Sequence, residues 1–201
     1  TQTQPANWSV NGTAVAFGAT DGANDMAEKI NAAATGVTAE AKLSVTIQNL
    51  SSADDDVLSV GGDDYDLGNF GGDGARLAEA MVADGYDAVY NSDDETITLN
   101  ATGVNGVQVD TAAGTGTGTV QLVNANEGAA AYTGTVDGDQ AVASTLSLTS
   151  ANKIAISDST AGANVSEYLG DDTANSSVTG TGAGSGLVSI ESIDISGTTS
   201  A

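Results

Sequence analysis

The sequence predicts an α+β fold, with two strand-strand-helix-strand units followed by a mostly β part. Three observations support this prediction. Alternating apolar and polar residues, the pattern of half-buried strands, recur along most of the 201 residues. Two short stretches, 23–30 and 77–81, place their apolar residues at helical spacing instead. Aromatic residues make up only 4 % of the chain, so the core must consist mainly of Val, Ile, Leu and Ala, and we expect thin packed layers.

A weak internal repeat organises the first part of the chain. The first unit opens with Trp8-Ser9-Val10-Asn11-Gly12, and the second opens with Leu58-Ser59-Val60-Gly61-Gly62. Each opening is an apolar strand followed by two residues that tolerate the positive φ of a tight hairpin turn. A second strand, a helix and a third strand follow in each unit. Trp8 lies in the first strand, and we interpret it as a core residue.

Each predicted helix begins at an aspartate that can cap it and ends at a glycine. These residues are Asp21 and Gly36 in the first unit, and Asp73 and Gly85 in the second. The apolar face consists of Ala23, Met26, Ala27 and Ile30 in the first helix, and of Leu77, Ala80 and Met81 in the second. The third strands are predicted over residues 37–47 and 88–99.

The helical signal fades after residue 102, and the rest of the chain is predicted to be β-rich. Alternating segments occur at residues 107–109, 120–123, 145–149, 153–157 and 187–195. We therefore predict two domains. Residues 1–100 hold the duplicated units, and residues 101–201 form the β-rich domain. Both ends of the chain have an extended pattern, as expected of a domain inserted into a larger protein.

Composition excludes several classes of function. The chain carries 27 acidic and 4 basic residues, for a formal charge of −23, which opposes binding to nucleic acid and to anionic membrane surfaces. It has no Cys and no His, so the usual ligands of zinc, iron–sulfur and haem sites are missing, as are the catalytic groups of Cys-His and Ser-His-Asp hydrolases. We predict no enzyme activity, no catalytic or metal-binding residues and no cofactor.

Acidic clusters are the remaining candidates for a calcium site. They are Asp54-Asp55-Asp56, Asp63-Asp64 with Asp66, Asp93-Asp94-Glu95 and Asp137-Gly138-Asp139. Calcium takes about six to eight oxygen ligands, and none of these clusters has the spacing of an EF-hand loop. We interpret them as solvated turn residues. A secreted calcium-dependent adhesin or surface-layer module is kept as the alternative function.

Two segments resemble a known family. Residues 10–15, 25–33 and 35–39 together resemble the "hook IN" motif, which recurs in outer domains of bacterial flagellins and in hook-associated proteins. The second unit is similar to a degenerate copy, with Gly61 where the motif has Asn. Residues 189–196, Ser-Ile-Glu-Ser-Ile-Asp-Ile-Ser, resemble the stretch at which flagellins re-enter their C-terminal core. In the family a long helix follows, whereas this chain ends at Ala201.

The resemblance implies a secreted structural protein of the bacterial flagellum, which serves motility. The chain would be an acidic outer domain of flagellin that projects from the filament core, and residues 101–201 would carry the return strand toward that core. Its partners would be neighbouring flagellin subunits, held through core helices outside this chain, with surface glycans or host surfaces as further candidates. Because those helices are outside the chain and each copy carries −23, we expect the isolated fragment to be monomeric or only weakly associated.

Overall fold

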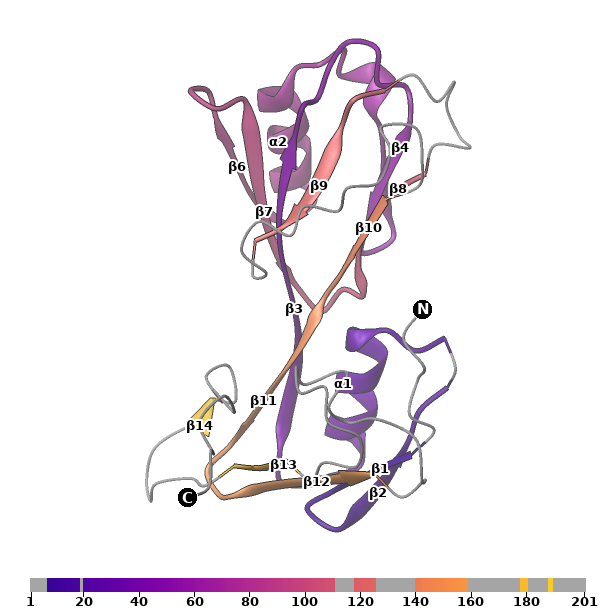
Figure 1. The fold of residues 1–201 in the computed structure, drawn as a ribbon, viewed down its shortest axis with the longest axis vertical. Coiled ribbons are helices and arrows are strands. Elements are labelled where there is room, and N and C mark those ends of the chain that lie inside the picture. Colours follow the sequence, from indigo (N-terminus) through magenta and orange to yellow (C-terminus); the bar gives the residue numbers. More distant parts are fainter. Residues whose placement is uncertain are drawn as a thin grey trace, which may run out of the picture. The chain divides into compact units, whose positions relative to one another are not determined.

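The structure is a computed structural model that describes residues 7–18, 20–110, 118–125, 140–158, 178–180 and 188–189. In these ranges, the chain forms two α-helices and a larger number of strands in antiparallel sheets, which confirms the predicted α+β, mostly β fold (Figure 1). The chain divides into two compact units. Unit 1 consists of Thr1–Ala41 and Thr145–Ala201, and unit 2 consists of Lys42–Ser144. The predicted domains, residues 1–100 and 101–201, stay a prediction.

Unit 1 begins with a hairpin and a helix. Its elements in chain order are β1 (Asn7–Val10), β2 (Thr13–Ala16), α1 (Ala23–Ala32), β3 (Thr38–Gln48), β11 (Thr145–Ser150), β12 (Ile154–Asp158), β13 (Val178–Gly180) and β14 (Val188–Ser189). The unit boundary falls within β3, between Ala41 and Lys42. One sheet has the strand order β13-β12-β1-β2, and β11 lies between β14 and β3 in a second sheet.

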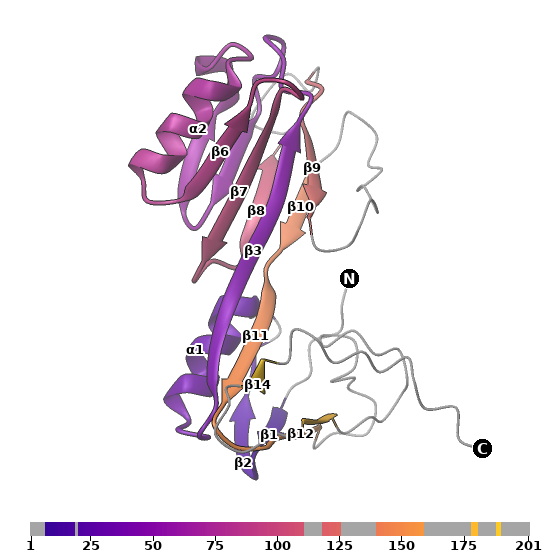
Figure 2. The same ribbon diagram turned by 90° about the vertical axis from the view of Figure 1, so that its left-hand side faces the viewer.

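Unit 2 repeats this plan. Its elements are β4 (Val57–Val60), β5 (Asp63–Asp66), the 3-10 helix η1 (Leu67–Asn69), α2 (Gly74–Ala83), β6 (Asp87–Asn91), β7 (Thr96–Thr102), β8 (Gly106–Asp110), β9 (Gln121–Asn124) and β10 (Gln140–Ala143). One sheet has the order β10-β8-β4-β5. In the other, β7 lies between β6 and β3, and β9 also pairs with β3. Figure 2 shows α2 on one face of β6 and β7.

Each unit has its own hydrophobic core, and equivalent positions supply it. In unit 1, Trp8 is fully buried, as predicted, and its ring meets Phe17 edge to face with ring centroids 5.2 Å apart. Such aromatic pairs stabilise a core beyond the area that they bury. The other buried side chains of this core include Val10, Val15, Met26, Ile30, Leu148, Ile154 and Ile156. The equivalent hairpin and helix positions of unit 2 are occupied by Leu58, Val60, Tyr65, Leu67, Leu77 and Met81.

The predicted limits of the helix in unit 2 are confirmed, and those in unit 1 are wrong. Asp73 caps α2 by accepting a hydrogen bond from the Arg76 amide, and Gly85 follows the last turn with φ +101°. In unit 1 the N-cap is Gly22, because the carboxylate of Asp21 is held by Lys29 and by the amide of Gly18. At the other end of α1, Ala34 takes the left-handed conformation with φ +49°, two residues before the predicted Gly36.

The single strand predicted over residues 88–99 is also wrong. Residues 92–95 form a turn, so the segment is a hairpin of β6 and β7 with the register Asn91↔Thr96. The physical reason is local. Ser92, Asp93, Asp94 and Glu95 offer no apolar side chain to the core, and Glu95 adopts a positive φ of +54°. The alternating segments predicted at 107–109, 120–123, 145–149 and 153–157 do form strands, while residues 190–195 lie outside the described residues.

The hairpin of β6 and β7 reveals a nested duplication. In unit 2 the order is hairpin, helix, β6, β7 and then β8, which pairs with β4, the first strand of the unit. In unit 1 the order is hairpin, helix, β3, β11 and then β12, which pairs with β1. The two four-stranded sheets have equivalent strand orders. Unit 2 is therefore inserted between β3 and β11, the position that corresponds to the turn at residues 92–95.

This topology predicts that unit 1 folds without unit 2. We expect a chain in which residues 42–144 are replaced by Ser-Asp-Asp-Glu, the turn of unit 2, to keep the fold of unit 1, because a loop of this length suits two antiparallel neighbours. Trp8 is the only tryptophan in the chain and lies in the core of unit 1, so its fluorescence emission reports on that unit. Emission and cooperative melting like those of the full chain are expected. Emission typical of a solvated indole would contradict the nested arrangement.

Candidate functional site

The hairpin turn of unit 1 makes polar contacts with segments far away in the sequence. Asn11 lies in the turn with φ +50° and connects it to two distant segments. Its side-chain amide donates a hydrogen bond to the Thr35 carbonyl, after α1, at 3.0 Å. Its side-chain oxygen accepts one from the amide of Ala155, in β12, at 2.8 Å. One side chain therefore fixes the turn against both the helix–strand loop and the neighbouring strand.

Unit 2 also joins its hairpin turn to the loop after the helix, but here the side chain that makes the contact comes from the loop. Gly61 occupies the turn position of Asn11, with a similar φ of +63°. The contact comes from Tyr86, in the loop after α2, whose hydroxyl lies 2.8 Å from the Val60 carbonyl and 2.7 Å from the Asp63 carboxylate. A Cβ atom at Gly61 would collide with this hydroxyl. Gly61 is thus more than a degraded motif position, because the missing side chain gives Tyr86 its place.

Two tyrosines lie between carboxylates at this corner of unit 2. Tyr65 donates a hydrogen bond to Asp84 at 2.9 Å. Burial raises the pKa of Tyr86 to about 12, and the hydrogen bond to Asp63 and the nearby negative charges act in the same direction. Burial also raises the pKa of Tyr65, with the hydrogen bond to Asp84 as the second cause. Both phenols are therefore held in their neutral form, in which they donate to the carboxylates.

The acidic cluster at residues 54–56 has a structural role. Asp54 is fully buried. One of its oxygens accepts hydrogen bonds from the amide and the hydroxyl of Ser51, and the other accepts from the amides of Thr119 and Val120. A Cβ atom at Gly118 would collide with this carboxylate. Asp54 therefore holds the segment at 118–120 against the loop that follows β3.

The other predicted clusters are separate turn and cap residues. Asp63, Asp64 and Asp66 bond to Tyr86, to the Ser59 hydroxyl and to the amide of Gly68, respectively. Residues 93–95 form the turn of the β6–β7 hairpin. Residues 137–139 lie outside the described residues. Within the described ranges, no group of three or more His, Cys, Asp or Glu side chains is arranged to hold a metal ion. The prediction that the chain has no catalytic, cofactor or metal residues stays a prediction.

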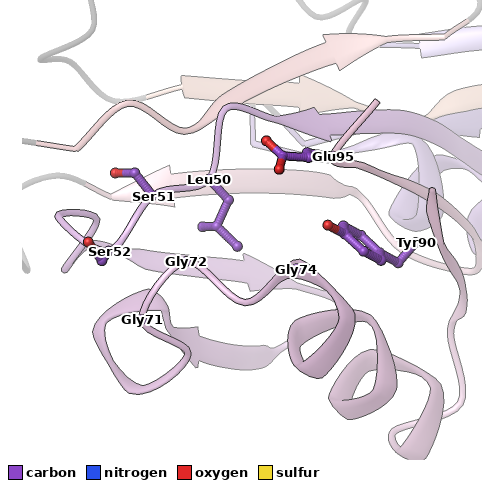
Figure 3. A pocket seen from close by; sticks show the side chains of 8 residues that line it. All are labelled: Leu50, Ser51, Ser52, Gly71, Gly72, Gly74, Tyr90 and Glu95. Carbon is purple, nitrogen blue, oxygen red and sulfur yellow. The ribbon is translucent and has the colours of Figure 1, made fainter. Parts of the chain in front are cut away.

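One pocket of about 290 Å³ lies in unit 2 (Figure 3). The residues that line it are Leu50, Ser51, Ser52, Gly71, Gly72, Gly74, Tyr90 and Glu95. Three of these residues are glycines, so bare backbone forms that part of the pocket wall. A Cβ atom at Gly74 would lie 2.7 Å from the ring of Tyr90. Glu95 is the single carboxylate among these eight residues, whereas a glycosidase site uses a pair. Of the two serines, Ser51 donates its hydroxyl to the buried Asp54 carboxylate, which already accepts three backbone amides.

Comparison with known families identifies the first repeat. Residues 8–49, which contain β1, β2, α1 and β3, match the family model of the flagellin hook IN motif. The match confirms the predicted resemblance and indicates a flagellin-related domain. It suggests a structural protein, and it implies the flagellum, which is extracellular. No curated protein matches the chain. No helix in the described ranges is long and apolar enough to cross a membrane.

Sequence reasoning missed the contact between Gly61 and Tyr86. The substitution of Gly for Asn at the turn was visible, and it was interpreted as decay of the motif. A paired signal was present in the sequence, because Tyr86 stands directly after the helix-ending Gly85, where the first unit has Thr35. A large side chain at one end of a contact and none at the other is the pattern of a compensated pair.

The compensated pair predicts a specific coupling in a double-mutant cycle. Gly61→Asn should destabilise unit 2 by about 1–3 kcal/mol through overpacking against Tyr86 and, to a smaller extent, Val104, since asparagine itself tolerates the positive φ. In a Tyr86→Thr background the same substitution should cost less, by about 1 kcal/mol or more. Denaturant unfolding measures all four free energies. Gly62→Asn is the matched control, because a Cβ atom there meets nothing within 4 Å, and its effect should add to that of Tyr86→Thr. Equal coupling at both glycines would contradict the pairing.

Alkaline pH should destabilise unit 2. The pKa of Tyr86 is raised from an unfolded value near 10 to about 12. The folded state therefore holds this proton more tightly, and the contribution to stability is complete below pH about 10 and is lost as pH rises toward about 12. Tyrosinate absorbance and circular dichroism, followed together through this range, should show delayed ionisation and then unfolding. Ionisation of all five tyrosines with a common midpoint near pH 10 in a folded chain would contradict this.

Proposed function

We propose that this chain is the surface domain of a flagellin, the subunit of the bacterial flagellar filament, and that it projects from the filament core. The observation that carries the proposal is the hook IN motif over residues 8–49, whose strands and helix form the first half of unit 1. The motif is a feature of flagellin-related proteins, and here it is built into a folded unit with its own core.

The nested topology supports an arrangement along the chain. Unit 1 contains both ends of the sequence, and unit 2 is reached only through β3 and left only before β11. In a flagellin that is continued at both ends by core helices, unit 1 would follow the core directly, and unit 2 would be the more distal part of the chain. Neighbouring flagellin subunits, joined through the core, would be the main partners, with surface glycans or host surfaces as secondary ones.

The chemistry of the chain fits a structural and surface role and not catalysis. The acidic side chains described above cap helices, close turns and anchor loops. The remaining negative charge, −23 in total, would give a filament a hydrated and mutually repelling surface. Secretion through the flagellum and a role in motility follow from the same proposal.

A chimeric flagellin tests this function. The outer region of the flagellin of a motile bacterium is replaced by residues 1–201, in a strain that lacks its own flagellin gene. The chain has no cysteine, so Asp93→Cys in the exposed turn of unit 2 gives one thiol. We expect motile cells whose filaments are labelled along their whole length by a maleimide dye.

The matched control for this chimera is the same protein without the Asp93→Cys substitution, which should give unlabelled filaments of equal length. Filaments that assemble but exclude the dye would contradict exposure of unit 2. Failure of the chimera to assemble, with the chain secreted and folded, would contradict the proposed place of this domain in a flagellin.

A further inference from the structure

Strand β6 is an edge strand with little protection against pairing. Its inner side pairs with β7, and no described strand pairs with its outer side (Figure 1). An unpaired strand edge is a template for another strand unless charges, prolines or bulges protect it. The five residues of β6, Asp-Ala-Val-Tyr-Asn, contain one charge and no proline. Val89, at the centre, is 60 % exposed and is one of two large exposed hydrophobic residues in the described part of the chain.

Three other edge strands, β5, β10 and β2, differ from β6. Strand β5 has the sequence Asp-Asp-Tyr-Asp, so three of its four residues carry charge. In β10, the side chain of Gln140 bonds to the Leu122 amide and the Val120 carbonyl, so that the segment at 120–122 lies against this strand. Strand β2 carries no charge, but its length of four residues opposes pairing with its own copy. In a full antiparallel pairing of an even number of residues with its own copy, exposed Ala14 would lie opposite buried Val15, on the wrong face of the sheet.

Strand β6 is self-complementary in one register. Its length is odd and its central residue is exposed, so two antiparallel copies related by a two-fold axis keep inward and outward faces in phase. In the register that pairs all five residues, Val89 lies opposite its own copy and Asp87 lies opposite Asn91 on both sides. No like charges are directly opposed, and Ala88 lies opposite Tyr90 on the core side. Asp87 accepts a hydrogen bond from the side-chain amide of Asn100, in the neighbouring strand β7, at 3.2 Å.

The outer face of this sheet carries few acids for so acidic a chain. The row next to the proposed axis is Val89, Thr98, Thr46 and Val123, across β6, β7, β3 and β9. Toward the turn, the pairs Asn91 with Thr96 and Gln48 with Gln121 are also uncharged. Two copies of a chain with charge −23 repel each other, and these residues carry no charge that would add to that repulsion.

We propose that β6 is a self-association edge, where it pairs antiparallel with β6 of a second copy of this chain around a two-fold axis at Val89. Two five-residue strands bury less surface than stable complexes do, so the pairing is weak and transient. Asp93 and Asp94 follow each strand closely, which makes the pairing weaker at low salt. Tethering of many copies at high local concentration strengthens such contacts without any new interaction. The pairing does not depend on the proposed function, because the isolated chain carries the whole edge.

Cysteine cross-linking tests the register directly. In Val89→Cys, the two thiols would face each other across the axis, where Cβ atoms of opposed residues are about 4.5–5.5 Å apart. Val82→Cys is the matched control, since Val82 is also an exposed valine of unit 2, 53 % exposed, on α2. We expect mild oxidation, or a short bis-thiol cross-linker, to give covalent dimers of Val89→Cys about tenfold faster than of the control. The difference should be greater at about 1 M salt, where the Debye length is about 3 Å, than at about 0.01 M, where it is about 30 Å.

A second variant separates pairing from chance collision. Val89→Lys places two like charges opposite each other, which opposes cross-strand pairing, and it should abolish the salt-induced dimer in analytical ultracentrifugation while the melting temperature stays close to that of the parent. Val82→Lys should leave the dimer unchanged. Equal cross-linking of the two cysteine variants, or a dimer that survives Val89→Lys, would overturn the proposal. An absence of cross-linked Val89→Cys dimers at high salt, with the chain folded, would overturn it as well.

Discussion

In both units the chain leaves a helix and enters a sheet beside the turn of the first hairpin, and one side chain fixes that corner. Asn11 reaches out from the turn in unit 1, and Tyr86 reaches in from the loop in unit 2. The corner sets the direction in which the third strand starts, and therefore the face on which the helix packs. Loss of a partly buried hydrogen bond at such a position costs more than the bond contributes when it is formed, because its partner is left unsatisfied. The two units thus make the same contact with side chains from opposite partners.

The nested arrangement follows from a property of antiparallel neighbours. Strands β3 and β11 are neighbours in one sheet. Near the start of β3, the hydroxyls of Ser150 and Thr149 donate hydrogen bonds to the carbonyls of Gly36 and Thr38. Because the strands are paired, the end of β3 and the start of β11 also lie close together. A turn and a whole domain with adjacent ends are equivalent ways to join such strands, and the entropy of closing the longer connection grows only slowly with length. Unit 2 can therefore occupy the place of a turn without a change in the sheets of unit 1.

Local signals in the sequence were enough for the elements but not for their partners. The alternation at 145–149 and 153–157 predicted strands correctly, as did Asp73 and Gly85 for the ends of α2, because those signals depend on neighbouring residues alone. The pairing of Trp8 with Asp158 joins residues far apart in sequence and leaves no local trace. The turn at 92–95 was visible as consecutive polar residues, yet the alternation on either side of it concealed the hairpin. The candidate acidic clusters were recognised, but only the structure shows that Asp54 is buried and holds a loop.

The distribution of acids resolves an apparent conflict in a chain with a charge of −23. Where a carboxylate accepts backbone amides, as Asp54 and Asp73 do, it stabilises the fold at neutral pH in spite of the global repulsion. Along the edge strand β5, three carboxylates also protect the edge against pairing with another strand. Strand β6 lacks this protection, and its one charged residue is bound within its own sheet. Aspartate thus serves two purposes in this chain, because it fixes loops and helix ends and it also protects a strand edge. Strand β6 is the edge at which we propose that a second copy adds its strand.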